Sequence, residues 1–318
     1  MITDIAALPR PFFALAPMDD VTDTVFRQVV ADCAAPDIFF TEFANVDGLQ
    51  SPGRVKLVTK LIHTNKDQPL IAQLWGLKPE NFFTTAKEIS GGKLGSFAGI
   101  DLNMGCPAKS EVQNGACSAL INNRELAREI IQATKEGAGG KIPVSVKTRI
   151  GFNNIDMTWP EFLLKQGIDM LTIHGRTRQE MSKVPAHWDV IQAIRQLRDD
   201  LSAKTLIVGN GDVLTRAQGE ALAKKYGLDG IMIGRGIFHD PFVFGRASPW
   251  ADYTKGQRIA LYLKQVQLFK QTWKNGERNV KTLNKFCKIY INDFAGAKEL
   301  RERLMAAGST DKLMAILQ

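Results

Sequence analysis

Eight short runs of apolar, β-branched and aromatic residues recur between residues 12 and 236, and this repetition limits the possible folds more than any other feature. The runs are FFALAP (12–17), IFFTEF (38–43), PLIAQLWG (69–76), GIDLNMG (99–105), PVSVKTRI (143–150), MLTIHGRT (170–177), KTLIVGNGDV (204–213) and GIMIGRG (230–236). Such runs are typical of strands that are buried on both faces, and therefore of a parallel sheet.

Segments with helical periodicity separate most of these runs. They cover residues 22–33, with Thr22 or Asp23 as the cap, and residues 79–90, 123–136, 159–167, 187–198 and 215–226. Only residues 44–68 fit a helix poorly. Eight strand–helix units predict an α/β fold of the (β/α)8 TIM barrel type. A doubly wound sheet would favour G-x-G-x-x-G after the first strand, and the turn APMDDVTD contains no glycine.

The pattern changes after the last strand. The remaining sequence predicts helices over residues 251–274, 277–293, 296–306 and 310–317. We therefore expect a catalytic barrel over residues 1–245 and a small helical domain over residues 246–318.

Positive charge is concentrated in the predicted helical domain. The whole chain carries 41 basic and 33 acidic residues, a net charge of +8, and residues 251–318 contain 13 basic and 6 acidic residues. If residues 277–293 form a helix, Arg278, Lys281, Lys285 and Lys288 fall on one face. A solvated surface is one interpretation. The scarcity of acids among these bases favours a polyanion such as nucleic acid.

Polar and reactive side chains follow seven of the eight predicted strands, at the end of the barrel where active sites form. They include Glu42, Gln73, Asn103, Cys106, Lys147, Arg149, His174, Arg176, Arg178, Asp212 and Arg235. The last two strands end in the glycine-rich turns GNGDV and GRG, and Arg235 adds a charge there. This pattern favours a phosphate, although glycines that only make tight turns are an alternative.

A phosphorylated ring cofactor such as FMN fits these positions. A lysine such as Lys147 can stabilise a reduced flavin, and a glutamine such as Gln73 can pair with the edge of the ring. Imine chemistry at Lys147 is the main non-redox alternative. Cys106 follows the fourth strand on a glycine–proline turn, where a mostly protonated thiol can act as a general acid.

Other features exclude several classes of protein. The four cysteines form no C-x-x-C pair, so we expect no metal site and a reducing, cytoplasmic environment. No apolar stretch approaches the roughly 20 residues needed to span a bilayer, and the N-terminus lacks a signal-peptide core. Nothing in the sequence requires a dimer, so we expect a monomer.

Nine motifs stand in a distinctive order: LAPMDDVTD, TEF, QLWG, DLNMGCP, NGACSAL, PVSVKTRIG, IHGRTR, VGNGDV and GIMIGRG. Together with KFCKIYINDFAGAKELRERL near the C-terminus, they make the chain similar to the tRNA-dihydrouridine synthase family over nearly its whole length. The combination is highly specific.

The resemblance implies an FMN-dependent oxidoreductase that uses NADPH. Cys106 would protonate C5 of a tRNA uridine while reduced FMN gives hydride to C6. Asn103 would orient the flipped-out uracil, with Arg178 and Lys109 near the RNA backbone. The helical domain, including Arg278, Lys281 and Lys285, would hold the tRNA. The residues that would bind FMN are Ala16, Pro17, Met18, Gln73, Lys147, His174, Asn210, Gly211, Asp212, Gly234 and Arg235.

One residue departs from the family pattern. Cys117 stands where the family usually has a glycine, and a cysteine there would be expected to alter the loop. Two alternatives to the family activity remain open. One is a flavin barrel that acts on a free pyrimidine or an enone and does not need the basic domain. The other is a catalytically inactive RNA-binding module.

Overall fold

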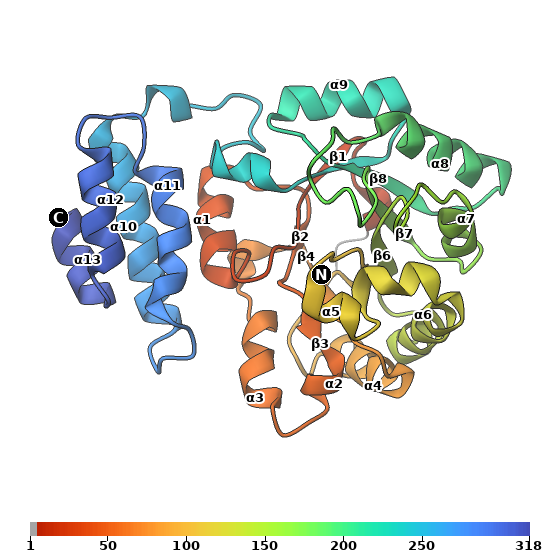
Figure 1. Cartoon of the computed structure of the whole chain (residues 1–318). Coiled ribbons are helices and arrows are strands. Elements are labelled where there is room, and N and C mark those ends of the chain that lie inside the picture. Colours follow the sequence, from red (N-terminus) through yellow and green to blue (C-terminus); the bar gives the residue numbers. More distant parts are fainter. Residues whose placement is uncertain (1–4) are drawn as a thin grey trace.

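The predicted barrel is present in the computed structural model, which describes residues 5–318 (Figure 1); the first four residues of the predicted 1–245 domain lie outside this range. Eight parallel strands follow one another around it in the order β1-β9-β8-β7-β6-β5-β4-β2. A bridge between Ala14 and Ile38 joins β1 to β2 and closes the ring. The strands are β1 (Phe12–Leu15), β2 (Phe39–Phe40), β4 (Leu70–Trp75), β5 (Gly99–Met104), β6 (Val144–Arg149), β7 (Met170–His174), β8 (Leu206–Asn210) and β9 (Gly230–Ile233), and β3 (Ala44–Asn45) pairs with the end of β4.

Helices form where the periodicity predicts them. They are α1 (Thr24–Ala34), α4 (Pro79–Ser90), α6 (Arg124–Ala138), α7 (Thr158–Leu164), α8 (Trp188–Asp200) and α9 (Arg216–Tyr226). Asp23 caps α1, because its carboxylate accepts the Phe26 amide at 2.9 Å. The segment that fits a helix poorly, residues 44–68, contains only the one-turn helices α2 (Val46–Leu49) and α3 (Arg54–Leu57) and short 3-10 turns.

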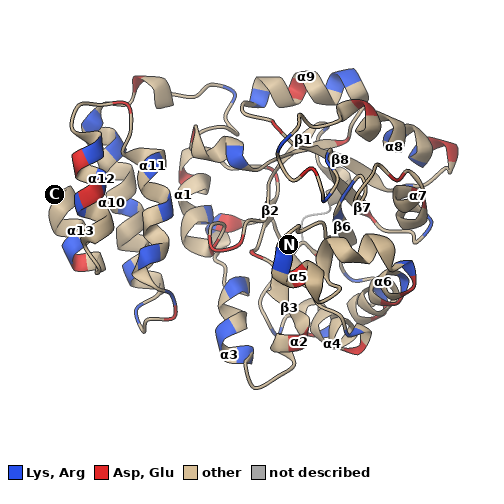
Figure 2. Ribbon diagram, viewed as in Figure 1, with Lys and Arg blue, Asp and Glu red and all other residues tan. Residues whose placement is uncertain are grey.

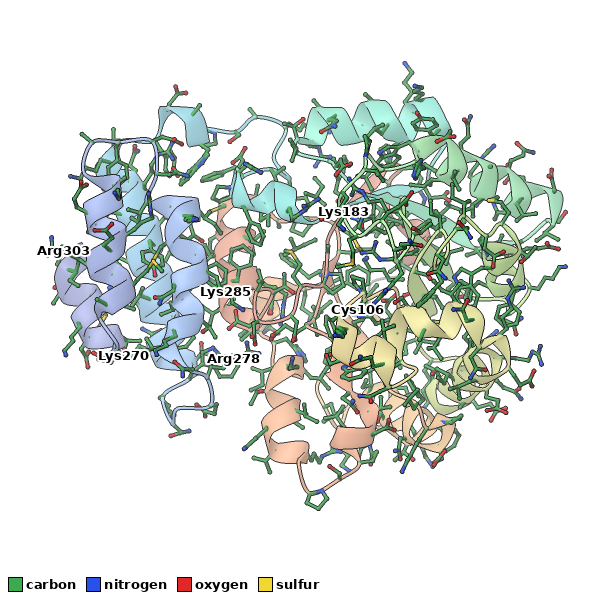
Figure 3. All side chains as sticks on the ribbon, in the orientation of Figure 1. Cys106, Lys183, Lys270, Arg278, Lys285 and Arg303 are labelled. Atoms are coloured by element: carbon green, nitrogen blue, oxygen red, sulfur yellow. The ribbon has the colours of Figure 1, made fainter. Side chains whose placement is uncertain are left out.

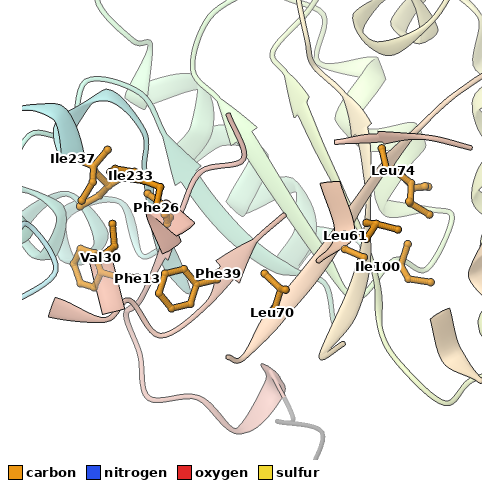
Figure 4. Close-up of a cluster of buried hydrophobic side chains, with 14 of the residues drawn as sticks. Phe13, Phe26, Val30, Phe39, Leu61, Leu70, Leu74, Ile100, Ile233 and Ile237 are labelled. Atoms are coloured by element: carbon orange, nitrogen blue, oxygen red, sulfur yellow. The ribbon is translucent and has the colours of Figure 1, made fainter. Parts of the chain in front are cut away.

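Side chains on successive strand residues point alternately to the inside and the outside of the barrel. Phe12 and Ala14 belong to a small apolar cluster with residues of the neighbouring strands. Phe13 and Leu15 belong to the larger cluster, in which Phe26 and Val30 of α1 also lie (Figure 4). The strands are therefore buried on both faces, as their continuous apolar sequences require.

The C-terminal region is helical, but one predicted helix is wrong. Residues 277–293 do not form a continuous α-helix: a 3-10 segment, Val280–Phe286, precedes the short helix α11 (Cys287–Tyr290). The other helices are α10 (Lys255–Thr272), α12 (Ala297–Ala306) and α13 (Thr310–Leu317). Because 3-10 geometry changes the spacing of side chains, Arg278, Lys281, Lys285 and Lys288 do not form one α-helical face.

The helical region packs against one side of the barrel. Helix α10 lies beside α1 (Figure 1). The ring of Phe286, at the end of the 3-10 segment, lies 4.9 Å from the ring of Phe26 in α1. Within residues 5–318, none of the helices combines the length and apolar character required to cross a bilayer.

Candidate active site at the C-terminal rim of the barrel

A cavity of ≈ 360 Å³ opens at the carboxyl ends of the strands. Its size lies in the range of about 300–1,000 Å³ that is usual for small-molecule sites. The structure gathers ten residues predicted to bind a cofactor around it: Ala16, Pro17, Met18, Lys147, His174, Asn210, Gly211, Asp212, Gly234 and Arg235. The cavity therefore lies where the loops after β1, β8 and β9 meet.

Gln73 is the one predicted cofactor ligand that does not line the cavity. It is fully buried, and its amide nitrogen donates to Asp101 at 2.7 Å. The Ser145 hydroxyl donates to the other oxygen of Asp101 at 2.6 Å. Burial raises the pKa of Asp101 to about 6, although these hydrogen bonds and Lys147 oppose the change. Sequence reasoning missed Asp101, whose only signal is a lone acid within the apolar strand GIDLNM.

Three cationic side chains line the cavity, those of Lys147, Arg176 and Arg235. Burial, helped by the charge of Arg149, lowers the pKa of Lys147 to about 8. Arg176 is also buried and pairs with Asp212, whose other oxygen lies 3.6 Å from Arg235. Because Arg235 is mostly exposed and Asp212 already pairs with Arg176, the outer end of the cavity retains positive charge suited to an anion.

His174 is neutral in this environment. Burial and the neighbouring cations Arg149, Lys147 and Arg176 lower its pKa to about 2. The Arg176 guanidinium lies 3.2 Å from Nε2 of the imidazole. A guanidinium can only donate, so Nε2 accepts and the ring proton lies on Nδ1. His174 is thus fixed as a neutral hydrogen-bond donor at Nδ1.

The glycines of the last two strand ends have different roles. Gly211 has φ of +131°, and a Cβ there would lie 2.7 Å from the Ala186 side chain. Because a side chain would clash there, packing alone accounts for the glycine at position 211. At Gly234, an added Cβ would meet only Ala16, at 3.6 Å. Gly234 therefore keeps the cavity wall open, which is the arrangement expected where a ligand approaches the backbone.

Cys106 lies directly after β5, on a loop held by Asn103. The Asn103 side-chain oxygen accepts the Cys106 amide at 2.9 Å and the Gly105 amide at 3.1 Å. The thiol of Cys117 and the amide of Ala108 hydrogen-bond to the Cys106 sulfur and lower its pKa to about 7, while burial opposes them. Near neutral pH, Cys106 is therefore close to half protonated and can donate or accept a proton.

Cys117 does not disturb the loop in the way its sequence position suggests. It is fully buried as a free thiol and has φ of +54°, the left-handed conformation that glycine favours. The cysteine thus adopts the glycine-like conformation, and its sulfur gains the contact with Cys106. The amide of Ser118 also donates to the Cys106 carbonyl at 3.3 Å, which ties the two parts of the loop together.

The remaining predicted substrate residues are spread over a wider surface. Lys109 is exposed at the start of α5 (Lys109–Gln113). Arg178 is half-buried with its guanidinium 5.4 Å from the centre of the Phe152 ring, and its Nε has no hydrogen-bond partner among residues 5–318. Lys281 and Lys285 are exposed in the helical region, whereas the Arg278 side chain is only 9% exposed and pairs with Glu42. The buried position of Arg278 differs from the exposed basic stripe that the sequence predicts.

Comparison with known proteins agrees with this geometry. A family model described as dihydrouridine synthase matches residues 14–318. A probable tRNA-dihydrouridine synthase of Staphylococcus aureus (strain COL) is 47% identical over 313 residues, covering 98% of this chain and 93% of the relative. The probable tRNA-dihydrouridine synthase 2 of Bacillus subtilis (strain 168) is 46% identical over 313 residues, with 98% and 94% coverage.

Solved structures share the fold at low sequence identity. Histamine dehydrogenase from Rhizobium sp. 4-9 superposes with a TM-score of 0.55 at 13% identity, over 80% of this chain and 48% of that protein. Morphinone reductase in complex with tetrahydroNAD gives a TM-score of 0.51 at 11% identity, over 73% and 85% of the two chains. At these identities the likeness supports the barrel architecture alone.

Proposed function

Because this chain belongs to the dihydrouridine synthase family, we propose that it reduces the C5=C6 bond of a uridine in tRNA, with FMN as its flavin and NADPH as the electron donor. The observation that carries the proposal is the convergence of Lys147, His174, Arg176 and Arg235 on one cavity, close to the loop that holds Cys106. A barrel that served only as an RNA-binding scaffold would not need buried cations beside a reactive thiol.

The donors around the cavity fit a phosphorylated flavin. Arg235, mostly exposed beside the glycine-rich turns, would hold the phosphate. Lys147 would stabilise negative charge on the reduced ring, and His174 would donate from Nδ1. Gly234 leaves its wall of the cavity open for such a group. Gln73 remains a proposed partner for the ring edge, and its amide is held in place by Asp101.

The chemistry of the chain itself centres on Cys106. When bound and reduced, FMN would supply hydride to C6 of the uracil ring. Cys106 would supply the proton that C5 requires, since its thiol is partly protonated near neutral pH. Asn103, which holds the Cys106 amide, would also orient the base. The thiolate left behind is stabilised by the thiol of Cys117 and by the charge of Lys147.

The substrate must reach this site from outside the barrel. A stacked uridine would have to leave its helix to approach Cys106. The exposed Lys281 and Lys285, with Lys109 and Arg178 nearer the barrel rim, would contact the phosphate backbone of the tRNA.

We also propose that the protein acts as a monomer in the cytoplasm, a reducing compartment in which its four free cysteines would persist.

A two-step experiment tests this function. The purified protein should carry the visible absorption of a flavin and lose it when mixed anaerobically with NADPH, with NADH as the comparison. Addition of an unmodified tRNA transcript should restore the colour and yield dihydrouridine by nucleoside mass spectrometry. Equal turnover of free uridine or a simple enone would support a general flavin reductase instead, and a colourless protein unable to take up FMN would contradict the proposal.

A further inference from the structure

Side chains from the helical region reach one segment at the barrel rim, the loop between β1 and α1. The Trp273 indole donates to the carboxylate of Asp23, the cap of α1, at 3.1 Å. The Lys285 ammonium lies 3.3 Å from the carboxylate of Asp20. Figure 3 shows Lys285 and Arg278 where the helical region meets the barrel, and Arg303 at its far side. The helical region thus contacts the active-site end of the barrel through this loop.

Of the two ion pairs in this group, the one made by Arg278 is the more buried. Its guanidinium donates to both oxygens of Glu42, with one distance of 3.2 Å, and lies 3.9 Å from a carboxylate oxygen of Asp23. The Glu42 side chain is completely buried, and the Arg278 guanidinium lies 5.0 Å from the centre of the Trp273 ring. Burial opposes the charge, but the two carboxylates raise the pKa of Arg278. Arg278 is therefore a charged group enclosed between the two regions.

Glu42 extends this contact toward the cavity. The oxygen that accepts from Arg278 at 3.2 Å also accepts the Asp20 amide at 2.8 Å. Two residues along, the Thr22 hydroxyl accepts the Met18 amide at 2.9 Å. Met18 lines the cavity together with the two residues before it. Arg278 is thus connected to the cavity wall through Glu42, the Asp20 amide and the backbone that leads from Asp20 to Thr22.

The acidic residues of this cluster already have cationic partners. Ligand atoms of Asp19, Asp20 and Glu42 lie within 4.8 Å of one another, an arrangement that could attract a metal ion. Lys60 pairs with Asp19, just as Lys285 and Arg278 pair with the other two. The cluster is accordingly explained by ion pairs between the helical region, the barrel and its loops.

We propose that Arg278 is a positioning residue: through Glu42 it holds the loop between β1 and α1 in the shape that forms one wall of the cofactor cavity. In this role Arg278 does not contact the RNA, and the helical region helps to build the flavin site as well as to bind substrate. The proposal rests on the proposed function insofar as the cavity is taken to bind FMN.

The test compares full-length Arg278→Met, Glu42→Gln and the double variant, with Arg303→Met as the control because Arg303 is exposed and lies away from the barrel. Hydrogen exchange of residues 15–24 without flavin reports the loop directly, and fluorescence titration gives the affinity for FMN. We expect Arg278→Met to accelerate exchange and to weaken FMN binding, each by roughly tenfold. The control should match the wild type.

The double variant distinguishes a positioning role of Arg278 from the destabilisation caused by an unpaired buried charge. Removal of Arg278 alone leaves a buried carboxylate unpaired, so the added Glu42→Gln change should restore part of both properties. If Arg278→Met does not fold, Glu42→Gln alone, which keeps an oxygen for the Asp20 amide, should still weaken FMN binding. The proposal would be overturned if Arg278→Met kept the hydrogen exchange and FMN affinity of the wild type but bound tRNA more weakly. Failure of the wild type to bind FMN would instead refute the proposed function, and the exchange experiment would still report the loop.

Discussion

Cationic residues are placed differently in the barrel and in the helical region. At the barrel rim, Lys147, Arg149 and Arg176 are enclosed among polar groups, and burial lowers the pKa of Lys147 to about 8. In the helical region, most basic side chains are exposed, and the blue segments of Figure 2 mark their positions along the ribbon. Enclosed cations change the acidity of their neighbours, whereas exposed cations attract a distant polyanion. On the proposed function, chemistry would take place at the barrel rim, and the exposed cations of the helical region would attract the RNA.

Replacement of Cys106 by alanine should give the largest effect. Unchanged dihydrouridine formation in this variant would mean that the barrel rim does not supply the proton through Cys106. We expect dihydrouridine formation to fall by roughly 10²- to 10⁴-fold, the usual contribution of a general acid. Flavin reduction by NADPH should stay at the wild-type rate, because Cys106 acts after that step. Stopped-flow absorbance and nucleoside mass spectrometry measure the two rates. Cys33→Ala is the matched control, since burial raises the pKa of that thiol to about 12.

Neutralisation of Lys281 and Lys285 tests whether exposed cations of the helical region bind tRNA. The double Lys→Gln variant should weaken tRNA binding and reduce the slope of log affinity against log salt by about one per lost phosphate contact. FMN affinity should not change in Lys281→Gln alone, because Lys281 lies outside the cavity and, of the two lysines, it is Lys285 that pairs with Asp20 on the loop of the cavity wall. Filter binding over a range of salt concentrations measures the slope. An unchanged slope would mean that these lysines are only a solvated surface.

The smallest expected effect concerns Cys117. Its thiol donates to the Cys106 sulfur and stabilises the thiolate, so the pKa of Cys106 lies near 7 rather than at its ordinary value of 9.0. In Cys117→Ala the pKa should rise, and alkylation of Cys106 at pH 7 should slow by several-fold to roughly tenfold, since one pKa unit is a factor of ten in thiolate. The rate of iodoacetamide labelling against pH gives the midpoint. An unchanged midpoint of the labelling curve would mean that Cys117 does not influence the pKa of Cys106.

The sequence predicts the barrel well because its signals are local. Each strand is a continuous apolar run, and Asp23 caps the helix that follows it directly. The convergence of Lys147, His174 and Arg235 also follows from topology, since parallel strands end on one rim. The expectation that Arg278 lies on an exposed helical face depends on a regular α-helix, and the 3-10 segment Val280–Phe286 changes that geometry.

Long-range pairings could not be predicted in the same way. Arg278 and Glu42 are 236 residues apart in the chain, and no local pattern marks them as partners. Gln73 stands at a strand position suited to a ligand, yet its amide is bound to Asp101 within the barrel. Cys117 acquires its role only because the loop folds back on Cys106. In each case, the three-dimensional partner determines what the residue does.

The contact between the helical region and α1, with Phe26 against Phe286 and the ion pairs beside it, has a consequence for substrate choice. A joint that combines packed rings with buried charges resists hinge motion, so the span from the exposed lysines to Cys106 is nearly constant. An RNA bound to those lysines would therefore be held at a fixed distance from the thiol of Cys106. The nucleotide presented to the thiol would then be selected by its offset along the folded RNA, and a change in the angle of docking would select a different one.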